Sequence, residues 1–196
     1  MACRLVLTFI GLLVAADSAA AQSSTDARNF PVNGNAPQVC AVQAPRLAAG
    51  AQINFRGLSG NTLQIDRLVD PSTLATNAAS ADIQFDAVCN FPHQIRLESQ
   101  NNGLWQTIER GVTPPDGFAY AIPYRATVSW GDVTGALDAD ARVRRIVEQR
   151  FNVDQATAGV ILIRVVIEAG SSNTNNNAPL VAGFYGDTLR LFVEPR

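Results

Sequence analysis

The segment over residues 118–130 alternates large apolar with small or polar side chains at a period of two. Successive side chains of a β-strand point to opposite faces, so this segment is predicted to bury one face and expose the other. Pro123 has no N–H group to donate, which predicts an edge or a bulge at that point of the strand. The residues assigned to the buried face are Phe118, Tyr120, Ile122, Tyr124, Ala126, Val128 and Trp130.

The same alternation recurs along the chain and predicts further strands. Residues 83–89 carry apolar side chains at every odd position, so Cys89 is expected to point into the core. Seven or eight strands at this spacing, separated by turn residues, predict an all-β antiparallel sandwich. The other strands are expected over residues 40–44, 53–55, 63–69, 94–99, 160–167 and 185–193.

The strand parities also predict which side chains form the hydrophobic core. Replacing an inward-facing residue such as Ile163 or Leu189 by alanine is expected to cost about 2–5 kcal/mol, because burial is lost and a cavity is left. The core residues predicted in this way are Phe85, Tyr124, Val128, Trp130, Ile163, Val165, Leu189 and Leu191.

Residues 138–151 depart from the period of two and predict a short helical insertion. Their apolar side chains follow helical spacing, and an aspartate at position 138 or 140 is available as the N-cap. Four arginines against three acidic residues give the segment a charge of +1, which fits a solvated helix face or a basic docking patch for a partner or an acidic surface. The apolar residues are Ala139, Val143, Ile146, Val147 and Phe151.

The first 21 residues have the three-part form of a secretory signal peptide. Arg4 gives a positive start, residues 5–16 are almost entirely apolar, and alanines occupy positions 19–21. The mature chain is therefore expected to begin at Gln22 and to be exported. No later segment approaches the roughly 18 apolar residues of a membrane helix, so no membrane insertion is predicted.

Export changes the interpretation of the cysteines. Cys3 leaves with the signal peptide, and the mature chain keeps Cys40 and Cys89. Two cysteines in an oxidising compartment most simply form one disulfide bond, which we predict here. The alternative, a redox or nucleophilic thiol, lacks a C-x-x-C spacing.

Composition and motifs argue against several other functions. The net charge is −2, from 15 basic and 17 acidic residues, so no nucleic-acid partner is predicted. No nucleophile elbow, zinc-protease motif or phosphate-binding loop is present, and no cofactor or metal is predicted. His93, the one histidine, is expected at a turn or on the surface. The asparagine-rich residues 171–177 are expected to form a solvated hairpin loop, with a sugar-contacting loop as the alternative.

The sequence from Ile83 to Asn90 ends a strand in a cysteine, and the last strand carries a regular motif. Over about residues 40–196 this pattern resembles the spore coat protein U domain, whose members are subunits of archaic (Csu-type) chaperone–usher pili. The motif of the last strand is similar to the final strand of such subunits. It consists of Gly183, Tyr185, Asp187, Leu189, Leu191 and Val193.

The resemblance implies an immunoglobulin-like sandwich that lacks its last strand and so has a hydrophobic groove between two edges. A periplasmic chaperone would fill the groove first. During assembly at an outer-membrane usher, the N-terminal extension of a sister subunit, or of another copy of the chain, would replace the chaperone strand. The chain ends directly after the predicted last strand, at residues 194–196, as such an incomplete fold implies.

Three regions follow from these observations: a signal peptide over residues 1–21, an N-terminal arm over 22–39, and the sandwich domain over 40–196. The arm is the candidate donor strand, although Pro31 and Pro37 would each remove one ladder hydrogen bond. The alternating donor candidates are Phe30, Val32, Gly34 and Ala36.

The predicted function is that of an exported, non-catalytic structural subunit of a cell-surface pilus, a fimbrium that serves cell adhesion and biofilm formation. Such a subunit passes through the periplasm and ends in the extracellular fibre. The alternatives are a surface adhesin or carbohydrate-binding sandwich module, and an exported hydrolase.

Overall fold

A computed structural model describes residues 28–107 and 115–196. The predicted signal peptide and residues 22–27 of the arm lie outside the described residues. The chain divides into two compact units, residues 1–36 and residues 37–196. The described part of the first unit, residues 28–36, is exposed throughout. All strands among the described residues belong to the second unit, and no described helix is long and apolar enough to cross a membrane.

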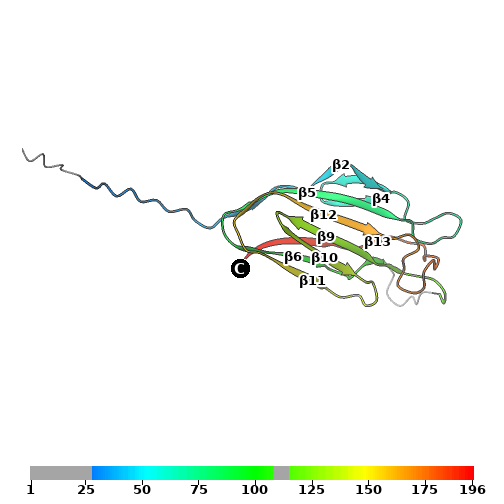
Figure 1. The fold of residues 1–196 in the computed structure, drawn as a ribbon. Coiled ribbons are helices and arrows are strands. Elements are labelled where there is room, and N and C mark those ends of the chain that lie inside the picture. Colours follow the sequence, from blue (N-terminus) through cyan, green and yellow to red (C-terminus); the bar gives the residue numbers. More distant parts are fainter. Residues whose placement is uncertain (1–27, 108–114) are drawn as a thin grey trace, which may run out of the picture. The chain divides into compact units, whose positions relative to one another are not determined.

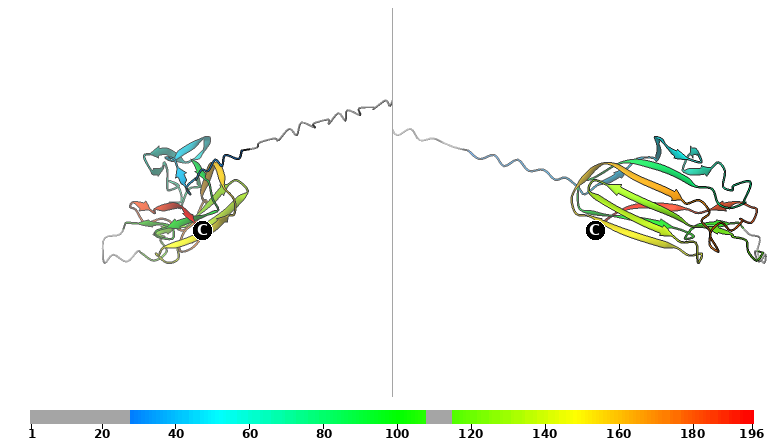
Figure 2. Two further views of the ribbon diagram at one scale, coloured as in Figure 1. Left: turned by 90° about the vertical axis from the view of Figure 1, so that its left-hand side faces the viewer. Right: turned by 45° about the vertical axis from the view of Figure 1, so that its right-hand side comes forward.

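The second unit is an antiparallel β-sandwich, as predicted, with two main sheets (Figures 1 and 2). The larger sheet has the order β1-β5-β12-β9-β10, and β2 pairs with the same edge of β5 as β1 does. Its strands are β1 (Cys40–Val42), β2 (Arg46–Ile53), β5 (Ala79–Cys89), β9 (Tyr124–Trp130), β10 (Val133–Ala139) and β12 (Thr157–Ile167).

The smaller main sheet has the order β11-β6-β14 and faces the larger one. It consists of β6 (His93–Ser99), β11 (Val147–Val153) and β14 (Leu189–Pro195). Two minor sheets complete the described fold. One joins β7 (Leu104–Gln106), β8 (Ala121–Ile122) and β13 (Tyr185–Gly186), and the other is the hairpin of β3 (Phe55–Ser59) and β4 (Thr62–Ile65).

The core lies between the two main sheets, where the strand parities place it. β12 is central, paired with β5 on one side and β9 on the other, and its apolar side chains at 161, 163, 165 and 167 are buried. Of the predicted core residues, Phe85, Leu189 and Leu191 are only half-buried. The others are buried as predicted: Tyr124, Val128, Trp130, Ile163 and Val165.

The predicted strand over residues 118–130 is interrupted at Pro123. Residues 121–122 form β8 of a minor sheet, and β9 begins at Tyr124 in the larger sheet. Since Pro123 cannot donate to a ladder, the chain changes sheets at this residue. Ala119 and Ala121, which the single-strand prediction placed on the outer face, are therefore fully buried. The predicted strand 185–193 is divided in the same way, into β13 and β14.

The predicted helical insertion over residues 138–151 is wrong. The segment contains the end of β10, a connection over residues 140–146 and the start of β11, which pairs with β6. The apolar positions 139, 143, 147 and 151 are four apart, so they satisfy a period of two as well as a helical period. Ile146 alone requires a helix, and its side chain is 57% exposed. Pairing with β9 at its start and with β6 at its end therefore decides the structure of this segment.

The predicted disulfide between Cys40 and Cys89 is confirmed. The two residues lie directly opposite each other where the short strand β1 pairs with β5. Asn90 continues this connection, because its side chain accepts a hydrogen bond from Val39 N–H (2.8 Å) and donates one to Pro37 O (2.7 Å). A covalent bond and an asparagine thus hold the N-terminal end of the sandwich on the larger sheet.

Candidate functional site

β14 is one of the two edge strands of the smaller main sheet. Within residues 28–107 and 115–196, β14 pairs only with β6. Gln100 N–H donates to Thr188 O (3.0 Å), which fixes the phase of the ladder. Hydrogen bonding alternates along an antiparallel pair, so the N–H and C=O groups of Leu189, Leu191 and Val193 point away from β6. These backbone groups are available to a further strand.

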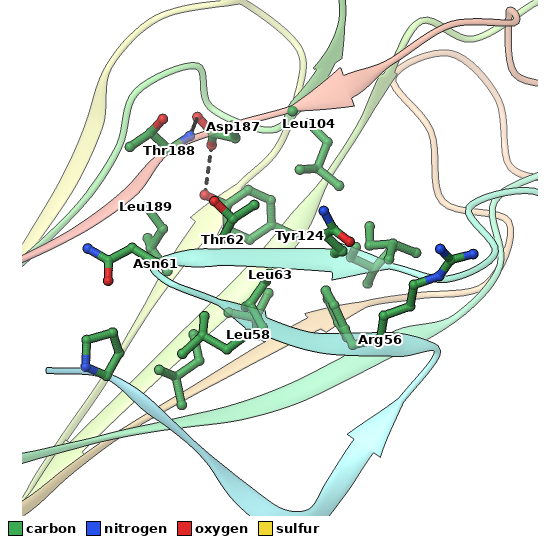
Figure 3. A pocket seen from close by; sticks show the side chains of 18 of the residues that line it. Arg56, Leu58, Asn61, Thr62, Leu63, Leu104, Tyr124, Asp187, Thr188 and Leu189 are labelled. Atoms are coloured by element: carbon green, nitrogen blue, oxygen red, sulfur yellow. Dashed lines mark hydrogen bonds between the residues drawn. The ribbon is translucent and has the colours of Figure 1, made fainter.

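A cavity of about 1110 Å³ lies beside this edge, between β14, the β3–β4 hairpin and the larger sheet (Figure 3). Leu189 and Leu191 line it from β14, and Phe85 lines it from β5. These three are the predicted core residues that remain half-buried, because the cavity takes the place of side chains that would cover them. The inward side chains of β14 therefore face an incomplete part of the core.

The β3–β4 hairpin forms the wall of the cavity opposite β14. Its apolar side chains at 55, 58, 63 and 65 line the cavity, and Figure 3 shows Leu58 and Leu63 beside it. Asn54 begins the hairpin with a positive φ of 57°, and its side-chain amide donates to Arg67 O (2.8 Å) and Ala78 O (3.0 Å). The hairpin is thus fixed at its base while its apolar face is turned toward the unpaired strand.

Asp187 anchors the start of β14 at the end of the cavity. Its Oδ2 accepts hydrogen bonds from the hydroxyls of Tyr124 (2.8 Å) and Ser99, and its Oδ1 accepts from the N–H groups of Asn101 (2.9 Å) and Thr188 (2.7 Å). Burial, and then the negative charge of Asp187, raise the pKa of Tyr124 well above its usual range. This carboxylate connects β14 to β6 and β9, and Figure 3 shows its bond to Tyr124.

The two motif residues before Asp187, Gly183 and Tyr185, each make a close contact that explains the residue type at that position. Gly183 has a φ of 150°, and a Cβ at this position would lie 2.5 Å from Gln106 Nε2. The Tyr185 hydroxyl donates to Val181 O (2.7 Å), and burial raises the pKa of Tyr185 to about 12. The motif that the sequence singled out therefore turns the chain, anchors it and places alternate apolar side chains beside the cavity.

The four donor candidates of the arm are all exposed. Phe30 is 81% exposed and Val32 is 95% exposed, and Gly34 and Ala36 are exposed too. Burying a highly exposed apolar side chain lowers the free energy more than burying one that is already half-covered, because more apolar surface leaves water. The arm therefore has the alternation of a strand without, among its described residues, any strand partner.

His93 is the first residue of β6. His93 is fully buried, which corrects its expected place at a turn or on the surface, and its ring lies 4.6 Å from the Trp130 ring. Its Nδ1 lies 2.8 Å from Phe91 O. No group of three or more possible metal ligands lies among the described residues.

The asparagine-rich segment is also more structured than predicted. It joins β12 to β13 and is not a hairpin loop. Asn173 Oδ1 accepts hydrogen bonds from the N–H groups of Tyr120 (3.1 Å) and Ala121 (3.0 Å), and Thr76 Oγ1 donates to Ser171 O (2.7 Å). Only residues 174–177 are exposed.

Sequence reasoning missed the hairpin wall and the hydroxyl partners of Asp187. Leu63 and Ile65 were assigned to a short strand, but alternation alone does not say whether the partner of an apolar face is a core or a cavity. Tyr124 was predicted on the inner face and Ser99 at the end of a strand, and no local pattern shows that their hydroxyls meet one carboxylate. The chain matches no family model and no curated protein.

Proposed function

We propose that this chain is an exported, non-catalytic structural subunit of a surface fibre, assembled by addition of a donor strand beside β14. One observation carries the proposal: the unpaired edge of β14 borders an apolar cavity that its own inward side chains line. An added strand would bond to the backbone of β14 and fill the cavity with alternate side chains.

A strand suits this site better than a small apolar ligand does. A ligand such as an acyl chain would cover Leu189 and Leu191, but it would leave the outward N–H and C=O groups of β14 without partners. Buried backbone groups without partners cost free energy, so an occupant that satisfies them is favoured. The polar rim, where Arg56 pairs with Asp66 (2.6 Å), gives the site a solvated border.

The N-terminal arm of another copy, or of a sister subunit, supplies the donor strand in this proposal. Phe30, Val32 and Ala36 lie on one face of an extended arm and are the side chains that would enter the cavity. A periplasmic chaperone would occupy the groove before assembly, and an outer-membrane usher would be the place of exchange. The resemblance to spore coat protein U subunits supports these partners.

The test is a fusion of residues 29–39 after Arg196 through a flexible linker. Tethering raises the effective concentration of the donor, and a concentration 100 times the dissociation constant adds about 2.7 kcal/mol to the free energy of unfolding. We expect a clear increase in the melting temperature of the fused chain. Thermal and chemical denaturation measure it.

The matched control carries the same linker and donor with Phe30→Asp and Val32→Asp in the appended copy only. This donor has the same length and prolines but places carboxylates in an apolar cavity. We expect it to give no stabilisation. Equal melting temperatures for the two fusions, with a lone chain that is already monomeric and stable, would contradict the proposal and favour a self-contained binding module.

A further inference from the structure

The connection between β10 and β11, residues 140–146, concentrates positive charge at the surface. We call it the arginine loop. Its three arginines, Arg142, Arg144 and Arg145, are exposed, and Asp140 is its one acidic residue, so its net charge is +2 (three minus one). A charge of this size on seven residues stands out in a chain whose net charge is −2.

The acidic residues that flank the loop already have other partners. Asp138 pairs with Arg125 (3.1 Å), and Glu148 pairs with Arg150 (2.8 Å) and Arg96 (3.5 Å). Among the described residues, no ion pair joins a carboxylate to an arginine of the loop. The side chains of Arg142 and Arg145 are exposed. Hydrogen bonds from Arg142 N–H and Asn102, and then the charges of the two arginines, lower the pKa of Asp140. The Nε of Arg144 donates to Asn101 Oδ1 (3.0 Å).

The backbone of the loop is fixed by buried Asn102. This residue donates from Nδ2 to Val143 O (3.1 Å) and to Asp140 Oδ1, and its Oδ1 accepts from Asp140 N–H (3.0 Å). Its own carbonyl accepts from Ala141 N–H (2.7 Å). The side chains of Arg142 to Ile146 thus project from a loop that is already ordered, so a ligand pays little entropy for ordering its backbone.

Two exposed aliphatic side chains accompany the arginines: Val143 lies between Arg142 and Arg144, and Ile146 follows Arg145. Val143 is 61% exposed and Ile146 is 57% exposed, although β-branched residues of this kind are usually buried. The loop has no aromatic residue, so it offers no platform for stacking on a sugar ring. It combines cations with a small apolar surface.

We propose that the arginine loop docks on a bilayer surface that carries anionic phospholipid headgroups. A bilayer places phosphate groups directly above acyl chains, so the three guanidinium groups and the two aliphatic side chains can be satisfied together. Guanidinium groups bind phosphate oxygens in pairs, and aliphatic side chains partition into the headgroup boundary. This proposal does not depend on how the cavity beside β14 is filled.

The strength of docking follows from the number of arginines. Each basic residue near an anionic bilayer increases binding about fivefold, so three give a factor of about 100. The attraction is screened by salt, since the Debye length falls from about 10 Å at 0.1 M to 3 Å at 1 M. Binding of a single copy is weak and reversible, and an array of copies would bind more tightly.

The experiment is co-sedimentation of the full chain with vesicles of phosphatidylcholine, with and without phosphatidylglycerol, after subtraction of protein that sediments alone. We expect binding only with phosphatidylglycerol, and loss of binding at high salt. Arg142→Gln/Arg144→Gln/Arg145→Gln should lower the binding constant about 100-fold. The matched control, Arg46→Gln/Arg164→Gln/Arg196→Gln, makes the same change in net charge at arginines that are already paired with carboxylates away from the loop.

Equal effects of the two triple variants would overturn the proposal, because net charge and not the loop would then govern binding. Val143→Ser/Ile146→Ser keeps the charge and should weaken vesicle binding about tenfold. Binding to alginate beads with no binding to vesicles would assign the loop to an acidic polysaccharide and overturn the lipid. Equal sedimentation with neutral and anionic vesicles would also overturn it.

Discussion

The two edges of the sandwich are completed in different ways. At one edge, β10 of the larger sheet and β11 of the smaller sheet lie in contact, and the ring of Phe151 covers Gly135. We call this the closed edge. At the other edge, which we call the open edge, β14 faces the β3–β4 hairpin and the end of β1 across a cavity of about 1110 Å³. Both edges border the same hydrophobic core.

This difference shows that alternation does not reveal whether a strand is fully covered. β12 and β14 both carry aliphatic side chains at every second position, yet Ile163 is 2% exposed while Leu191 is half-buried. Ile163 lies on a central strand and does not line the cavity, whereas Leu191 lies on an edge strand and lines it. At the closed edge an aromatic side chain fills the space, and at the open edge a cavity remains.

The largest expected effect concerns the disulfide beside the open edge. In Cys40→Ser/Cys89→Ser, β1 keeps only a three-residue pairing with β5. The bond closes a loop of 49 residues, which corresponds to about 4 kcal/mol in the chain-entropy model. Chemical denaturation should show a loss of this size. An unchanged midpoint would mean that packing at the open edge is sufficient without the bond.

The second comparison replaces one aliphatic residue in the covered core and one at the open edge. Ile163→Ala should cost about 2–5 kcal/mol, because it leaves a cavity in a complete core. Leu191→Ala should cost less, about 1–2 kcal/mol, because this side chain already faces a cavity. In the chain fused to a donor strand, the cost of Leu191→Ala should rise toward that of Ile163→Ala. Equal costs in the unfused chain would contradict the open edge.

Much of the sandwich could be predicted from residues whose partners are decided by alternation, such as Val128 and Val165. The prediction failed where two periods coincide. Positions 139, 143, 147 and 151 fit both a helix and a strand. Pairing with β9 at residue 139, and with β6, more than 40 residues earlier in the chain, from residue 147, selects the strand. Local spacing carries no information about such a partner.

Alternation also predicted one wall of the candidate site but not the other. Its motif residues follow the alternation of the last strand, so Leu189 and Leu191 were found. The opposite wall comes from Phe55 and Leu63, which are more than 120 residues away in the sequence. Their relation to β14 is a property of the folded chain.

The third comparison uses a glycine at each edge. A Cβ at Gly135 would lie within 2.5 Å of three ring atoms of Phe151, so Gly135→Ala must displace that ring and should cost about 1–3 kcal/mol. At Gly186, in β13 near the open edge, nothing lies within 4 Å of a Cβ, and Gly186→Ala should change stability by less than about 0.5 kcal/mol. Urea denaturation of both variants measures the difference. A larger cost at Gly186 would mean that the open edge is more tightly packed than the closed one.

The smallest expected effect is a pH dependence at the open edge. Burial raises the pKa of Tyr185 to about 12 in the folded chain, whereas an unfolded tyrosine titrates near 10. Between pH 10 and 12 the unfolded chain therefore loses a proton that the folded chain keeps. The contribution of Tyr185 to stability is complete below pH 10 and declines as the pH rises toward 12. Solvent screening of a half-buried side chain keeps this decline small.

Tyr185→Phe has no proton to lose and should decline less steeply over this interval, although its stability at pH 7 is lower because the bond to Val181 O is lost. Tyr185 also lines the cavity, so a donor strand fused after Arg196 should bury it further and move the decline to higher pH. Denaturation midpoints from pH 8 to 12 test both expectations. The same slope in the fused and unfused chains would mean that the donor does not reach Tyr185, and the added strand would then have to lie farther along β14, beside Leu191 and Val193.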